Sequence, residues 1–79
     1  VYGSLTIGDN TKVGTIKLTG SNGYVKKTYL GNGAVVDNFD LNGRTDKIEI
    51  IIKEGAKVMI NGTEYNNSAG TEPMILTTL

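Results

Sequence analysis

A stretch of twelve residues, 38 to 49, carries oxygen-bearing side chains at the spacing of a calcium-binding loop. Oxygen ligands occupy its first, third, fifth and ninth positions, glycine is sixth and glutamate is twelfth; these residues are Asn38, Asp40, Asn42, Asp46, Gly43 and Glu49. This is the EF-hand pattern, in which glycine permits a sharp bend and the last glutamate can bind Ca²⁺ through both oxygens.

The match to the calcium pattern is incomplete. Asn38 replaces the usual aspartate, Thr45 stands where a large aliphatic residue is normal, and the flanking segments are β-prone instead of helical. Asn, Asp and Gly also gather in β-turns for backbone reasons alone. We therefore expect an ordinary loop without a metal or other cofactor, and keep a calcium site as the alternative.

Catalytic side chains are scarce. The chain has no histidine and no cysteine, which excludes Ser-His-Asp triads, Cys-His dyads and the usual zinc sites. Two carboxylates can cleave a glycoside, and Asp37 and Asp40 are close enough in sequence to be considered. This chemistry also needs a substrate cleft, and in a domain with so small a core we expect these acids to lie on a solvated loop instead. We expect a protein that is not an enzyme and has no catalytic residues.

Several large apolar or aromatic residues fall where a strand would expose them. Ile51 and Met59 alternate out of phase with their apolar neighbours, and the segment around Ile75 is apolar on both faces. Tyrosine rings could also stack on sugars. The predicted interaction surface therefore comprises Tyr24, Tyr29, Ile51, Met59, Met74 and Ile75. It would serve self-association or a protein partner, or alternatively a surface glycan.

Charge and hydropathy exclude other partners. Eight basic residues balance eight acidic ones, so the electrostatic attraction that supports nucleic-acid binding is missing. No apolar run approaches the roughly 20 residues of a membrane span. Residue 1 opens directly into strand-like sequence without a leader. We expect residues 1–79 to form a single domain that is one module of a larger protein or assembly.

Glycine- and asparagine-rich turns separate short segments of alternating polarity. The strongest local signal is Asn61-Gly62 between two β-prone runs, which predicts a tight hairpin. The pattern predicts an all-β fold: a small antiparallel β-sandwich, immunoglobulin-like, or a flattened barrel of about seven short strands. The predicted core consists of Ile7, Ile16, Leu18, Val35, Ile48, Ile50, Ile52, Val58 and Ile60.

The Asn-Gly pairs at 22, 32 and 42 are ten residues apart, which raises the question of an internal repeat. Their flanking residues share no pattern, and solenoid repeats usually span 20 residues or more. We expect a simple meander instead.

The composition, with polar turns and neither His nor Cys, is similar to that of phage tail, baseplate or head-fibre domains and of immunoglobulin-like modules in bacterial surface proteins. This is an analogy of composition only. It favours a non-catalytic structural or attachment module of an extracellular assembly, located outside the cell or in a virion. The alternative is a carbohydrate-binding module of a secreted enzyme.

Overall fold

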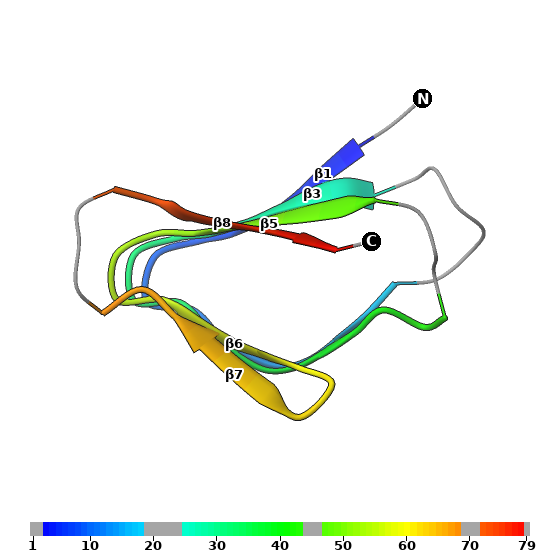
Figure 1. Cartoon of the computed structure of the whole chain (residues 1–79). Helices are drawn as coiled ribbons and strands as arrows, with labels where there is room; N and C mark the ends of the chain where they lie inside the picture. The colour runs from blue at the N-terminus through cyan, green and yellow to red at the C-terminus, as the bar shows by residue number, and fades with distance from the viewer. Residues whose placement is uncertain (1–2, 19–24, 44–46, 69–71, 79) are drawn as a thin grey trace.

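The computed structural model describes residues 3–18, 25–43, 47–68 and 72–78, and within them the protein is all-β, with no helix. Two four-stranded sheets face each other (Figure 1), an arrangement compatible with the predicted β-sandwich. The strands are β1 (Gly3–Ile7), β2 (Lys12–Lys17), β3 (Val25–Leu30), β4 (Val35–Asp40), β5 (Ile48–Ile52), β6 (Lys57–Ile60), β7 (Thr63–Asn66) and β8 (Met74–Thr78). Among these residues, no helix exists that could cross a membrane.

From β1 to β6 the chain alternates between the two sheets, and β7 stays in the sheet of β6 before β8 returns to the other. The first sheet has the order β1-β3-β5-β8 and the second has the order β2-β4-β6-β7. Strands β1, β3 and β5 are parallel, as are β2, β4 and β6. The pairs β1–β2, β3–β4 and β5–β6 thus form coils 1, 2 and 3, which stack as in a β-helix. Strands β7 and β8 run antiparallel to β6 and β5 and form the opposite edge of the two sheets.

The prediction of antiparallel strands is wrong for four of the six strand pairs. There are eight strands instead of about seven, and the immunoglobulin-like and barrel forms are not confirmed. The chain is also repetitive, contrary to the meander prediction: Val13, Val36 and Val58 share one rung and are 23 and 22 residues apart. The Asn-Gly spacing of ten is unrelated to this period, because the pairs at 32 and 42 lie before and after β4, at opposite ends of that strand; the pair at 22 lies outside the described residues.

Three stacked turns join the sheets at one end of the molecule (Figure 1). Their third residues, Asn10, Gly33 and Gly55, have positive φ angles of 58°, 72° and 80°. The Asn10 N–H donates to the Asn32 carbonyl at 2.8 Å, and the Gly33 N–H donates to the Glu54 carbonyl at 3.1 Å. The coil-to-coil hydrogen bonding of the sheets therefore continues through the turns.

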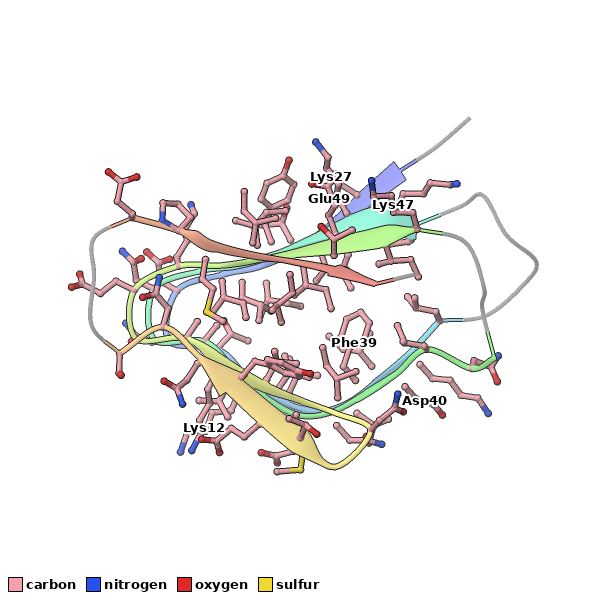
Figure 2. The ribbon with its side chains drawn as sticks, viewed as in Figure 1. Lys12, Lys27, Phe39, Asp40, Lys47 and Glu49 are labelled. Carbon is pink, nitrogen blue, oxygen red and sulfur yellow. The ribbon has the colours of Figure 1, made fainter. Side chains whose placement is uncertain are left out.

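The core fills the space between the sheets, with Phe39 near its centre (Figure 2). Six predicted core residues are buried: Leu18, Ile48, Ile50, Ile52, Val58 and Ile60. Ile7 and Ile16 are partly buried against them. The prediction that Val35 belongs to the core is wrong, because Val35 is only half-buried and its neighbour Val36 occupies the core. Two adjacent valines leave the inward face ambiguous in the sequence.

Coil 1 ends the stack in an open edge, formed by strands β1 and β2. Ile7 and Val13 are half-buried, whereas their rung partners Leu30 and Val36 in coil 2 are fully buried. The backbone of the edge is also unpaired on one side, since neither sheet has a described strand beyond β1 or β2.

The hydrogen bonds between coils identify which backbone groups face the open edge. In coil 2, the Gly31 N–H donates to the Ile7 carbonyl at 2.8 Å and the Val35 N–H donates to the Thr11 carbonyl at 2.9 Å. The equivalent groups of coil 1 are the N–H groups of Gly8 and Lys12. These two N–H groups point away from coil 2. On that outer side of coil 1, the described residues supply no acceptor.

Candidate functional site

A shallow depression of about 570 Å³ lies on the outer face of the first sheet. Its lining residues are Gly3, Ser4, Lys26, Lys27, Tyr29, Lys47 and Glu49. Figure 2 shows Lys27, Lys47 and Glu49 close together on the first sheet. We call this hollow the lysine–tyrosine depression.

The strand register builds the depression. Ser4, Lys27 and Glu49 lie side by side on one rung of β1, β3 and β5. Tyr29 is two residues beyond Lys27, so strand alternation places both on the outer face. Gly3 and Ser4 are small, and the longer side chains of β3 and β5 rise beside them. The hollow is therefore a consequence of residue size along one edge strand.

Positive charge predominates in the depression. Three lysine side chains line it, against the single carboxylate of Glu49, although the whole chain carries no net charge. Lys27 neighbours Glu49 on its rung, yet neither Lys27 nor Lys47 forms an ion pair with any carboxylate of the described ranges. Neither Lys27 nor Lys47 therefore has a carboxylate of those ranges in direct contact.

Three residues of the predicted interaction surface meet on one rung. Tyr29, Ile51 and Ile75 are neighbours on the outer face of the first sheet. Ile75 is 59% exposed, whereas Ile51 is only 8% exposed between its neighbours. The outer apolar patch on this sheet is therefore smaller than the sequence suggests.

The remaining residues of that predicted surface are dispersed. Met59 lies in β6 of the second sheet and is 37% exposed. Met74 pairs with Ile52 and packs against the core. Tyr24 lies outside the described residues. The five described residues therefore lie on both sheets and do not form one continuous surface.

The structure does not bring the calcium-loop residues together. Asn38 and Asp40 lie in β4 of the second sheet, whereas Glu49 lies in β5 of the first, and Figure 2 shows Asp40 and Glu49 on opposite sides of the molecule. Asp40 Oδ1 accepts a hydrogen bond of 2.8 Å from the Asn42 N–H, an ordinary turn contact. Asp46 lies outside the described residues. No group of three or more carboxylates in the described part of the chain could hold a metal ion.

The carboxylates considered for glycoside cleavage are also separate. Asp37 lines a smaller depression, of about 170 Å³, on the outer face of the second sheet. Asp40 is not among its lining residues. Lys57 and Glu64 in the same depression form an exposed ion pair at 4.0 Å, which adds little stability.

Sequence reasoning missed the lysine–tyrosine depression. Ser4, Lys27 and Glu49 are far apart in sequence and meet only through the parallel register of 23 and 22 residues. The recurring valines at 13, 36 and 58 carry that period and could have shown it.

No family model matches the chain, and no curated protein or solved structure matches it either. Proposals about its function therefore rest on its own fold and surface.

Proposed function

We propose that the chain is a non-catalytic structural or attachment module of an extracellular assembly, such as a phage tail, baseplate or head fibre or a bacterial surface protein. It would join its neighbour through the open edge of coil 1. The observation that carries this proposal is the row of outward N–H groups at Gly8 and Lys12 beside half-buried apolar side chains.

Physical reasons support a joining role. An edge strand with unpaired N–H and C=O groups is a template for another strand. Stacked coils bury their apolar faces only against neighbours, so a terminal coil gains burial when another strand pair covers it. Leu5, Ile7, Val13 and Ile16 would lose solvent contact in this way. Each Å² of apolar surface removed from water contributes about 25 cal/mol.

Proline at position 12 tests the proposal. Lys12→Pro removes an outward N–H without breaking a bond between coils 1 and 2, and proline is tolerated where its position faces the free side of an edge strand. Lys12→Gln is the matched control, since it removes the same charge and keeps the N–H.

Sedimentation over a range of concentrations would measure self-association, with circular dichroism as a check of folding. We expect the unmodified chain and Lys12→Gln to associate, and Lys12→Pro to remain a folded monomer. A monomeric unmodified chain at high concentration, or equal association of all three, would contradict joining through this edge.

The second candidate function is a carbohydrate-binding module of a secreted enzyme. It is supported by the lysine–tyrosine depression, where Tyr29 adjoins the polar side chains of Ser4 and Glu49. Tyr65 does not contribute to this surface, because it packs against the core from β7. Titration with oligosaccharides, monitored at Tyr29, distinguishes this function from the first.

A further inference from the structure

We infer that the lysine–tyrosine depression binds an acidic polysaccharide, a polymer whose sugars carry carboxylate groups. This inference rests on the second candidate function and is independent of the open edge. It begins from the combination of several ammonium groups, one tyrosine ring and one carboxylate in a single hollow.

The ammonium groups give the depression its selectivity for anions. Lys27 and Lys47 line the same hollow, on adjacent strands or at their ends, and no described carboxylate pairs with either. The Debye length at physiological ionic strength is about 8 Å, so nearby charges can act together on one bound anion. Exposed ion pairs are individually weak. A polymer with repeated anionic groups offsets this weakness, because when one group dissociates its neighbours remain at a high effective concentration near the lysines.

Tyr29, Ser4 and Glu49 suit the sugar part of such a ligand. A tyrosine ring offers an apolar face and a hydroxyl group that can form hydrogen bonds. The Ser4 hydroxyl can donate or accept a hydrogen bond, and the Glu49 carboxylate can accept bonds from sugar hydroxyls. The hollow therefore provides partners for both the ring and the hydroxyls of a sugar.

Glu49 also argues against a nucleic acid or a membrane as the ligand. It lies beside Lys27 on one rung, so a dense array of phosphates would meet a carboxylate within the site. The chain as a whole has no net positive charge to offset that repulsion. A polymer that separates its carboxylates with hydroxyl groups fits this arrangement better.

Oligogalacturonate is a suitable probe, and its fully methyl-esterified form is the matched neutral sugar. Binding would be followed by calorimetry and by amide chemical shifts at low and physiological salt. Lys27→Gln/Lys47→Gln removes the proposed contacts. Lys12→Gln/Lys57→Gln removes two lysines of the second sheet, and Figure 2 shows Lys12 on the side opposite Lys27.

We expect binding of oligogalacturonate that weakens about tenfold in Lys27→Gln/Lys47→Gln, weakens in added salt and is unchanged in Lys12→Gln/Lys57→Gln. Equal affinity for the esterified sugar would overturn the inference and leave a carbohydrate-binding function standing. Absence of binding to either sugar would overturn both. Binding to anionic phospholipid vesicles without binding to sugar would also overturn the inference and identify a membrane surface as the partner.

Discussion

Thr28 places a hydroxyl group inside an otherwise apolar rung. Its neighbours across the first sheet are Leu5 and Ile50, and Leu76 lies beyond them. Thr28 is fully buried, and its Oγ1 has no hydrogen-bond partner among the described residues. An unsatisfied buried polar group costs about 1–3 kcal/mol.

Thr28→Val should therefore raise the free energy of unfolding by about 1 kcal/mol, because valine keeps the shape and removes the unpaired hydroxyl. Urea denaturation would measure the change. Thr6→Val is the control, since Thr6 is exposed on the outer face of the same sheet. A loss of stability in Thr28→Val would show that the hydroxyl finds a partner in solution.

Gly31 is required by the close approach of two turns. A Cβ atom at this position would lie 2.7 Å from the Asp9 nitrogen and 2.8 Å from the Gly8 carbonyl carbon. Both contacts involve backbone atoms, so the turns would have to move apart.

We predict that Gly31→Ala destabilises the protein by about 1–3 kcal/mol, the usual cost of overpacking. The control is Gly14→Ala, because a Cβ at Gly14 meets nothing within 4 Å. Thermal or urea unfolding of the two variants should separate clearly. Equal stability would contradict tight stacking of the turns.

At the scale of elements, the same turn chemistry leads to two different connections. Asn61 and Gly62 have φ angles of 51° and 79°, and Asn42 and Gly43 have φ angles of 53° and 74°. The first pair closes the predicted β6–β7 hairpin, which is confirmed. The second pair follows β4, whose two edges are already occupied by β2 and β6. A free neighbouring edge, and not the turn alone, decides whether a hairpin forms.

The Asn67 side chain, just after β7, connects the end of β5 to the segment that precedes β8. Its Nδ2 donates to the Ile52 carbonyl at 3.0 Å and to the Glu72 carbonyl at 2.8 Å. Asn67→Ala should lower the free energy of unfolding by about 2 kcal/mol, because a buried carbonyl loses its donor. Asn66→Ala is the control, because Asn66 is exposed and its Nδ2 donates to the exposed Glu64 Oε2 at 3.3 Å instead of to a buried carbonyl. Similar losses in both variants, measured by urea unfolding, would contradict this role.

These elements show what the sequence could and could not predict. Alternation and turn residues correctly indicated an all-β chain, the Asn61-Gly62 hairpin and the inward face of Ile48, Ile50 and Ile52. A parallel ladder has no local signature, because its partner strands are separated by a whole coil. Strand pairing, and with it the depression around Lys27, depends on the repeat that aligns Ser4, Lys27 and Glu49, and the Asn-Gly spacing of ten does not reveal that repeat.

At the scale of the whole molecule, the separation of Asp40 from Glu49 predicts the response to calcium. We expect Ca²⁺ to leave the melting temperature unchanged, because these two carboxylates belong to different sheets. A site occupied at a hundred times its dissociation constant would add about 2.7 kcal/mol. Thermal melts in excess Ca²⁺ and in chelator would reveal it. An upward shift that is lost in Asp40→Ala would contradict the expectation.

The position of each strand within the two sheets also implies a gradient of local unfolding. Strands β5 and β6 are flanked on both sides by other strands, whereas β1 and β2 each have one neighbour. In stacked-coil proteins each coil is stabilised mainly by its nearest neighbours, so the coil with one neighbour should fray first. Native-state hydrogen exchange should find amide protons in β1 and β2 less protected than those in β5 and β6. Uniform protection would indicate that all coils open together.

Local unfolding of β1 and β2 would make the rate of amide exchange at the open edge sensitive to assembly. An edge strand that opens often can pair with other strands. Once it has a second neighbour, its local opening costs more free energy and becomes rarer. Exchange in β1 and β2 should then slow on assembly, while β5 and β6 change little. The edge that we propose to receive another strand is therefore also the edge at which hydrogen exchange can follow local unfolding.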